Sequence, residues 1–246
     1  MLANRPTQVI AFAGGGKATG RTTLAVQTAI SLARSRYRVI LVDENSGPAS
    51  AMGSLEIEDT GDLVDALIAG TPLEKIIWKV GPNLWIASAK RTAALLSVDS
   101  PKAMEIAATL MAPLESAANF VLIDSLVLDS GQLSLLSAQA HHMVVVVSAT
   151  PDAITSAYTV IKRLVKERGR DGFHLAITHA HSHMEAATIY DNVRKTAQRY
   201  LKVRVDFLGS LPFPLPDNLS DIFLSCLPII SSNSATRYAT TSGRKK

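Results

Sequence analysis

The sequence contains a single cysteine and no long apolar run, and each shortage excludes a class of protein. Cys226 has no partner for an intramolecular disulfide, so the chain lacks a disulfide framework and suits a reducing compartment. The longest apolar run, Met143–Val147, has the length of a strand and is too short to cross a bilayer. The first expected strand begins at Gln8 and leaves no room for a signal peptide before it. We therefore expect a soluble protein of the cytoplasm.

A dense stripe of arginine and lysine is also missing. The formal net charge is +4, and part of this excess comes from the last three residues, Arg244–Lys246. A solvated, mildly basic surface accounts for this charge better than a nucleic-acid footprint, which needs basic residues clustered on one face. DNA is therefore not an expected partner.

The composition is that of a globular chain with one large core. Of its 246 residues, 47% are hydrophobic, which is sufficient for a single α/β domain. We expect this domain to span residues 1–240, with a basic flexible tail over residues 241–246. Four segments are apolar at consecutive positions, as is typical of parallel strands covered on both faces. They are Val9–Ala13, Val39–Val42, Val121–Ile123 and Met143–Val147.

Strand and helix candidates alternate along the chain. The expected strands are Gln8–Ala13, Arg38–Val42, Asn83–Ala87, Phe120–Ile123, His142–Ser148, Phe173–Thr178 and Phe207–Ser210. The expected helices are Thr22–Ser35, Asp62–Ala69, Pro101–Ser116, Ser130–Ala140, Ala153–Arg168 and Met184–Tyr200. This alternation predicts an α/β fold with a doubly wound, mainly parallel sheet flanked by helices. Ligands of such folds bind at the carboxyl ends of the strands.

A glycine-rich segment follows the first expected strand. Gly15, four further residues and then Gly20-Arg21-Thr22 fill the frame of a phosphate-binding P-loop, G-x-x-x-x-G-K-[ST], with Arg21 in place of the lysine. In such a loop the backbone N–H groups surround phosphate oxygens, and the following helix offers its positive N-terminus. Thr22 is placed to reach Mg²⁺. The segment predicts a fold derived from P-loop nucleotide-binding proteins.

Three motifs resemble those of the MinD/ParA class of deviant P-loop ATPases, which are SIMIBI-like P-loop NTPases. Gly16–Thr22 is similar to the K-G-G-x-G-K-[ST] loop, and Val42–Gly47 is similar to the segment that carries D-x-D. Phe120–Ser125 is similar to the strand that ends in the Walker B aspartate. The resemblance covers about residues 8–240.

Later segments resemble the branch of this family that controls flagellar number and position, FlhG/FleN. They are the strand-to-helix segment Ser148–Lys162, the late strand and base-side loop Phe207–Pro212, and the proline-containing segment Leu227–Ile230. Thr178 falls at the position that contacts adenine in the family, where asparagine is usual.

The resemblance implies a site for ATP or ADP with Mg²⁺. The expected nucleotide-binding residues are Gly15, Gly16, Lys17, Ala18, Thr19, Gly20, Arg21, Thr22, Thr23, Thr178 and Pro212. Thr22, Asp43 and Asp124 are the expected residues around Mg²⁺. The expected catalytic positions are Asp43, Asn45 and Asp124, of which Asn45 is degenerate.

The chain departs from the family pattern at three positions of this site. The signature lysine, which reaches the nucleotide of the partner subunit, is replaced by Gly16, with Lys17 displaced by one residue. Arg21 keeps a positive charge but has a bulkier, forked head group. Asn45 replaces the second aspartate of D-x-D, and an amide has no basic carboxylate with which to polarise the attacking water. These changes predict weak or absent hydrolysis.

The resemblance and its departures together predict a regulator of flagellar number, placement or biosynthesis that acts through protein partners. The implied partners are a signal-recognition-type flagellar GTPase, a flagellar transcriptional activator or a basal-body component. Met1–Thr7 lacks the segment by which the flagellar branch stimulates its GTPase. We expect no direct membrane anchor, because Ser231–Lys246 shows no apolar face at helical spacing.

Two alternatives stay open. An active MinD/ParA-like positioning or partitioning ATPase would let Lys17 and Arg21 share the phosphate role, and it would form a homodimer in the presence of ATP and Mg²⁺. A degenerate protein would keep one oligomeric state with or without nucleotide. A ParA-like protein that acts on DNA would bind DNA nonspecifically, with an affinity that falls steeply with salt.

Overall fold

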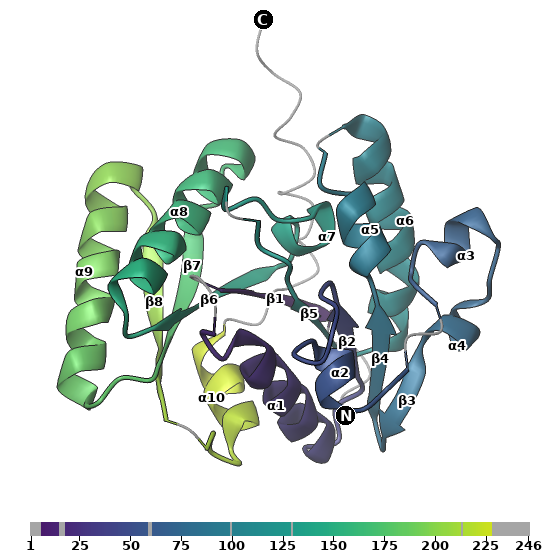
Figure 1. The fold of residues 1–246 in the computed structure, drawn as a ribbon, viewed down its shortest axis with the longest axis horizontal. Helices are drawn as coiled ribbons and strands as arrows, with labels where there is room; N and C mark the ends of the chain where they lie inside the picture. The colour runs from purple at the N-terminus through teal and green to yellow at the C-terminus, as the bar shows by residue number, and fades with distance from the viewer. Residues whose placement is uncertain are drawn as a thin grey trace, which may run out of the picture.

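The chain forms a sheet of eight strands between two layers of helices (Figure 1). This computed structural model describes residues 6–14, 18–58, 61–98, 100–128, 130–212 and 214–227. The strands are β1 (Gln8–Gly14), β2 (Val39–Asp43), β3 (Trp78–Gly81), β4 (Leu84–Ser88), β5 (Phe120–Asp124), β6 (His142–Ser148), β7 (Gly172–Thr178) and β8 (Arg204–Leu211). The helices are α1 (Arg21–Arg34), α2 (Ala51–Ser54), α3 (Asp65–Ile68), α4 (Leu73–Ile76), α5 (Lys90–Leu95), α6 (Pro101–Ala117), α7 (Leu135–Ala138), α8 (Pro151–Arg168), α9 (His183–Leu201) and α10 (Leu219–Cys226).

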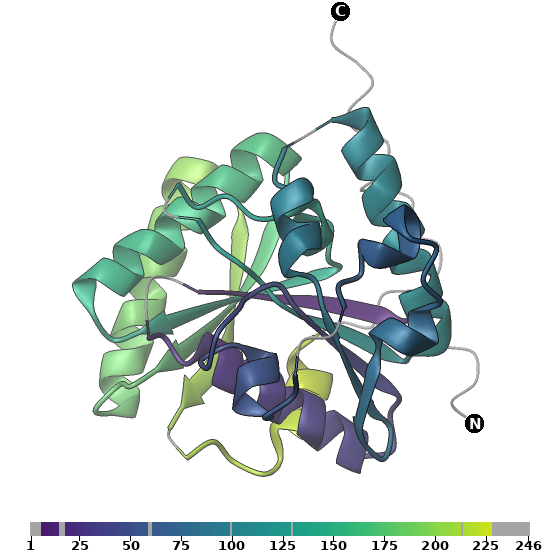
Figure 2. The same cartoon turned by 45° about the vertical axis from the view of Figure 1, so that its right-hand side comes forward.

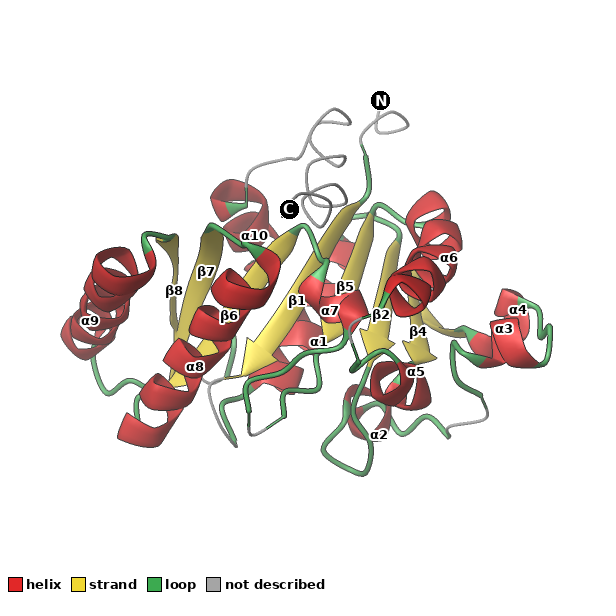
Figure 3. Ribbon diagram, turned by 90° about the horizontal axis from the view of Figure 1, so that it is seen from above, coloured by secondary structure: helices red, strands yellow, loops and turns green. Residues whose placement is uncertain are grey.

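The strand order confirms the predicted doubly wound, mainly parallel sheet. The order is β3-β4-β2-β5-β1-β6-β7-β8, and β3 pairs antiparallel with β4 while the other neighbours pair in parallel. Seen from above, the parallel strands carry their arrowheads along one edge (Figure 3). β1, β2, β5 and β6 are buried at every position, because helices cover both of their faces.

Each face of the sheet has its own apolar core. On one face, α6, α7, α8 and α9 pack over the strands, and on the other face the covering helices are α1, α2 and α10. The turned view shows the sheet twisting between these layers (Figure 2). The described helices include none that is both long and apolar enough to cross a membrane.

β1 lies at the centre of the sheet, and the direction of winding changes there. β5 is its neighbour on one side and β6 on the other. The carboxyl ends of β2 and β5 are level, since Asp43 pairs in register with Asp124. Phe12 of β1 also lies opposite Asp124. The loop after β1 therefore opens at the switch point of the sheet, where α/β folds bind ligands.

The expected helix Ser130–Ala140 is wrong, because only Leu135–Ala138 of this segment is helical. Gly131 has a φ of 78°, which belongs to the left-handed region and interrupts a right-handed helix. The helix starts instead after Ser134, whose hydroxyl accepts a hydrogen bond from the N–H of Ser137.

Most of the elements that the sequence pattern does not predict are short. The expected helix Asp62–Ala69 is helical only over Asp65–Ile68, and α2 and α4 have four residues each. A single turn contains too few residues to show a helical period. β3, α5 and α10 were likewise not expected. The predicted tail, residues 241–246, lies outside the described residues.

Candidate functional site

The glycine-rich loop joins the centre of the sheet to α1. Gly15, Gly16 and Lys17 lie outside the described residues. Ala18 and Gly20 have φ values of 53° and 75°, in the left-handed region. Gly20 is the residue before α1 and provides no side chain to cap the helix. The first-turn N–H groups of α1 are therefore without a side-chain cap, as in a phosphate-binding loop.

A cavity of about 820 Å³ opens beside this loop. It is lined by Ala18 to Thr23, by Asn45 to Ser46 and Ala49 to Ser50 after β2, by Leu126 to Leu128 after β5, by His179 after β7 and by parts of α8. Its size falls within the range typical of small-molecule sites. The contributions of Thr155, Ser156 and Thr159 from α8 were not expected from the sequence. Their only sequence signal is a cluster of hydroxyl residues on one helix.

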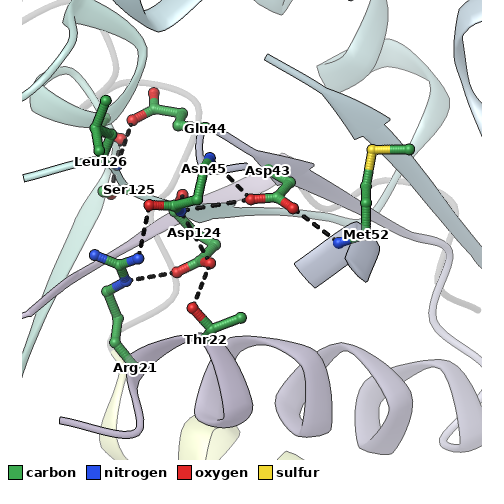
Figure 4. Close-up of polar contacts among 10 residues, drawn as sticks. Arg21, Thr22, Asp43, Glu44, Asn45, Met52, Asp124, Ser125 and Leu126 are labelled. Atoms are coloured by element: carbon green, nitrogen blue, oxygen red, sulfur yellow. Dashed lines mark hydrogen bonds and ion pairs between the residues drawn. The ribbon is translucent and has the colours of Figure 1, made fainter. Parts of the chain in front are cut away.

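The side chain of Arg21 turns toward the end of β5. Its Nε donates a hydrogen bond to Asp124 Oδ1 at 2.6 Å, and its Nη2 donates to Asn45 Oδ1 at 2.9 Å (Figure 4). Thr22 Oγ1 donates to the other oxygen of the same carboxylate, Asp124 Oδ2, at 2.7 Å. The first turn of α1 is thus joined through two side chains to the end of β5.

Asn45 bridges the two expected carboxylates. Its Nδ2 donates to Asp124 Oδ2 at 3.0 Å and to the main-chain oxygen of Asp124 at 2.8 Å. The main-chain N–H of Asn45 donates to Asp43 Oδ1 at 3.0 Å. The second oxygen of Asp43 accepts the main-chain N–H of Met52, the second residue of α2, at 2.8 Å. We call Arg21, Thr22, Asp43, Asn45 and Asp124 the Asp124 cluster.

Burial dominates the electrostatics of this cluster. Asp43 and Asp124 are almost completely buried. Burial raises the pKa of Asp124 from its ordinary value, and the neighbouring guanidinium of Arg21 opposes that rise. The ion pair between Arg21 and Asp124 is therefore the main stabilisation of a charged carboxylate at this position.

Glu44 is a buried acid that the sequence analysis did not single out. Its Oε2 accepts the N–H of Leu126 at 2.9 Å, and its Oε1 accepts the hydroxyl of Ser134. Burial raises the pKa of Glu44 to about 7, against these hydrogen bonds, which lower it. Its only sequence signal is its place between Asp43 and Asn45, because the loop that buries it lies more than 80 residues further along the chain.

Two expected nucleotide contacts do not line the cavity. Thr178 is fully buried, and its hydroxyl donates to the main-chain oxygen of Thr19 at 2.7 Å, so it ties the end of β7 to the loop. Pro212 directly follows β8, is exposed and does not line the cavity. Their contact with a base stays a prediction.

The described residues do not fit a magnesium ion in this arrangement. Thr22, Asp43 and Asp124 are brought together as expected, but all four carboxylate oxygens already accept hydrogen bonds from protein donors. Mg²⁺ binds through oxygen ligands and bound waters in a strict octahedron. A guanidinium against Asp124 also repels a second cation. Within the described ranges, no group of three or more His, Cys, Asp or Glu side chains could hold a metal ion.

The chain is similar in sequence to two bacterial proteins. The antiactivator FleN of Pseudomonas aeruginosa is 29% identical over 216 residues, which cover 85% of this chain and 74% of FleN. The flagellum site-determining protein YlxH of Helicobacter pylori is 23% identical over 212 residues, which cover 83% of this chain and 69% of YlxH. No family model matches the chain.

Solved structures share the fold. A plasmid partition protein of Borrelia burgdorferi, bound to AMPPNP, superposes with a TM-score of 0.68 at 19% identity, covering 91% of this chain and 100% of that protein. The MinD cell division protein of Aquifex aeolicus superposes with a TM-score of 0.64 at 20% identity, covering 98% of this chain and 100% of that protein. At these identities the likeness concerns the fold, and it agrees with the parallel sheet described above.

Proposed function

Since the chain is a MinD/ParA-type P-loop protein of the FlhG/FleN-like family, we propose that it regulates the number or placement of flagella by binding protein partners in the cytoplasm. In this proposal its ATP hydrolysis is weak or lost. The names of the two relatives, an antiactivator and a flagellum site-determining protein, support the flagellar part. The candidate partners are a signal-recognition-type flagellar GTPase, a flagellar transcriptional activator and a basal-body component.

The loss of hydrolysis is supported by one observation, the contact of Arg21 with Asp124 and Asn45. Two nitrogens of the guanidinium donate hydrogen bonds to these residues, at 2.6 and 2.9 Å. A lysine at this position of a P-loop reaches the β- and γ-phosphates. Asn45, moreover, provides an amide where a carboxylate would polarise water. Removal of a single transition-state contact of this kind typically costs a factor of about 10²–10³ in rate.

Nucleotide binding is proposed to be retained at a reduced level. The cavity of about 820 Å³ and the first turn of α1, which has no side-chain cap, support an anionic ligand of nucleotide size. Hydrolysis and binding therefore have to be measured separately.

The direct test combines isothermal titration with phosphate release. The purified protein is titrated with ATP and with AMPPNP, in Mg²⁺ and in EDTA, and phosphate is followed in parallel. Binding without release supports the proposal. Turnover that Asp43→Ala abolishes would establish an active ATPase and overturn the loss of hydrolysis. A gel-filtration run with ATP and Mg²⁺ adds the oligomeric state, which the proposal expects to be unchanged.

The regulatory part is tested in cells. Deletion of the gene should change the number or the position of flagella, counted by electron microscopy, and the wild-type gene should restore them. Asp43→Asn, which keeps a side chain of the same size at this buried position, should restore them as well, because hydrolysis is not needed in this proposal. Pull-down with the purified flagellar GTPase and transcriptional activator identifies the partner. An unchanged flagellar count in the deletion strain would contradict the flagellar assignment.

A further inference from the structure

Arg21 stands at the position of the P-loop lysine, and its guanidinium contacts the carboxylate of Asp124. We propose that its guanidinium replaces the divalent metal ion at Asp124, so that the site carries its own cation and does not use Mg²⁺. The inference concerns the same site as the proposed function, and it rests on that function only in treating the Asp124 cluster as a former metal-nucleotide site. It makes no use of flagellar regulation.

The first argument is the set of contacts around Asp124. Its Oδ1 accepts Arg21 Nε at 2.6 Å, and its Oδ2 accepts Thr22 Oγ1 at 2.7 Å and an amide N–H of Asn45 at 3.0 Å. Charge-assisted hydrogen bonds at such short distances are the strong ones. A metal ion would have to displace the guanidinium, or would have to sit beside it.

The second argument is burial. The side chain of Asp124 is completely buried, and only 16% of the side chain of Arg21 is exposed. A buried carboxylate needs a counter-charge, because an isolated ion is strongly destabilised away from water. Arg21 provides that charge from inside the protein. A second positive ion at the same carboxylate would be repelled over a short distance with little screening by water.

The third argument is the fit between Arg21 and Asn45. An amide can accept a hydrogen bond through its oxygen and donate through its nitrogen, whereas a carboxylate only accepts. Asn45 uses both abilities, since its Oδ1 accepts Arg21 Nη2 while its Nδ2 donates to Asp124 Oδ2. An aspartate at this position would place a second negative charge about 3.0 Å from Asp124. The arginine and the asparagine therefore act as a matched pair.

This matching gives the two departures from the family motif one physical explanation. A cluster of three aspartates and a lysine, as in the family motif, would attract a divalent ion. In the cluster found here, the guanidinium of Arg21 already pairs with the charge of Asp124. The third carboxylate is replaced by the amide of Asn45. We infer that ligand binding at the neighbouring cavity is the same in Mg²⁺ and in EDTA.

The experiment measures thermal unfolding of the full chain without nucleotide, in MgCl₂ and in KCl of equal ionic strength. The wild-type protein should show the same Tm in both salts. Arg21→Ala should have a lower Tm in KCl, and MgCl₂ should raise it by about 3 °C because a bound ion stabilises the folded state. Arg91→Ala is the matched control, since it removes an ion pair with Asp65 at an exposed site, and its Tm should not respond to Mg²⁺.

A second measurement covers the case in which Arg21→Ala does not fold. Mn²⁺ binding is followed by electron paramagnetic resonance for the wild type, for Arg21→Lys and for Arg21→Lys combined with Asn45→Asp. The wild type should bind no Mn²⁺ at this site, and the double variant should bind one ion. Mn²⁺ bound by the wild type at a site that Asp124→Asn removes would overturn the proposal. It would also be overturned if no variant gained metal binding, because Arg21 would then not be the residue that excludes the ion.

The two proposals fail in different ways. ATP turnover by the wild type that requires Mg²⁺ overturns both. Metal binding by the wild type without turnover overturns the metal-free site and leaves the proposed regulatory function intact. Turnover of equal rate in Mg²⁺ and EDTA overturns the loss of hydrolysis and supports the role of Arg21 as the internal cation.

Discussion

Two buried carboxylates of this molecule have their hydrogen bonds satisfied in contrasting ways. Asp62 accepts the main-chain N–H groups of Val64, Arg91 and Thr92, at 2.7–3.2 Å, and a single side-chain donor, the hydroxyl of Thr92. Asp124 accepts its hydrogen bonds from the side chains of Arg21, Thr22 and Asn45. Both aspartates are almost completely buried. We call Asp62, Asp65, Arg91 and Thr92 the Asp62 cluster.

The difference separates a carboxylate that stabilises a helix N-terminus from one that joins distant segments beside a cavity. The carboxylate of Asp62 lies against the N-terminus of α5 and accepts two N–H groups of its first turn. This is the ordinary position for a negative side chain near a helix. The donors to Asp124 are side chains, and they come from segments 79–103 residues away. They meet at the carboxyl edge of the sheet beside a cavity. This arrangement supports the proposal that the Asp124 cluster is a former ligand site.

Arg21→Ala should produce the largest effect, because it leaves the carboxylate of Asp124 buried without a counter-charge. We expect the free energy of unfolding in the absence of divalent ions to fall by about 4 kcal/mol, the usual cost of removing one partner of a buried ion pair. Urea unfolding followed by circular dichroism measures it. A loss below about 1 kcal/mol, the value of an exposed pair, would contradict the role of Arg21.

Protonation of Glu44, next to the Asp124 cluster, should make stability depend on pH. Its pKa is about 7 in the folded protein and 4.5 ordinarily, so the folded state binds the proton more tightly. The contribution of protonated Glu44 to the free energy of unfolding is therefore fully present below pH 4.5. About 3 kcal/mol of this free energy is lost as the pH rises to about 7. Urea unfolding of the wild type and of Glu44→Gln at pH 5 and pH 8 isolates this effect. A difference between the two proteins that stays constant with pH would rule it out.

Asp62→Asn tests the Asp62 cluster. An amide cannot accept at both of its terminal atoms, so one of the N–H groups now bound by Asp62 loses its acceptor whichever way the amide turns. We expect a loss of about 2 kcal/mol in the free energy of unfolding, the cost of one buried unpaired donor. The same loss should be measured in Mg²⁺ and in EDTA. Dependence on Mg²⁺ would remove the distinction between the two clusters.

Arg91→Ala should have the smallest effect. Arg91 donates to Asp65 near the surface, where more than half of its side chain is exposed. Exposed ion pairs of this kind contribute about 0.5 kcal/mol. The comparison of Arg91→Ala with Arg21→Ala in the same urea titration measures how much the burial of Asp124 matters. Equal losses in the two variants would show that it does not.

The central strands could be predicted from the sequence to within one or two residues. β1, β2, β5 and β6 are apolar at consecutive positions, and this pattern depends on little else than burial on both faces. The helix prediction was wrong for residues 130–134, although their sequence pattern is compatible with a helix. Gly131 is left-handed, and Ser134 caps a helix that begins only after it. Elements of a single turn could not be predicted for lack of a period.

The candidate site could be predicted in part. The motif spacing brought Thr22, Asp43 and Asp124 to one edge of the sheet, which the register of β2 with β5 bears out. The hydrogen bonds by which Asn45 joins Asp43 to Asp124 could not be foreseen. Comparison with the motif shows only that a catalytic carboxylate is missing at this position. Glu44 was overlooked for a related reason, since its burial depends on a loop more than 80 residues further along the chain.

By itself, the sequence determined the parallel sheet, the place of the glycine-rich loop and the residues available at the carboxyl edge. These follow from local apolar patterns and from backbone freedom, which neighbouring residues decide. The partner of Arg21 was decided by the tertiary structure alone. A charged side chain forms strong hydrogen bonds with a buried carboxylate within its reach. Which carboxylate that is depends on how α1 and the loop after β2 lie against the end of β5, which is 79–103 residues further along the chain.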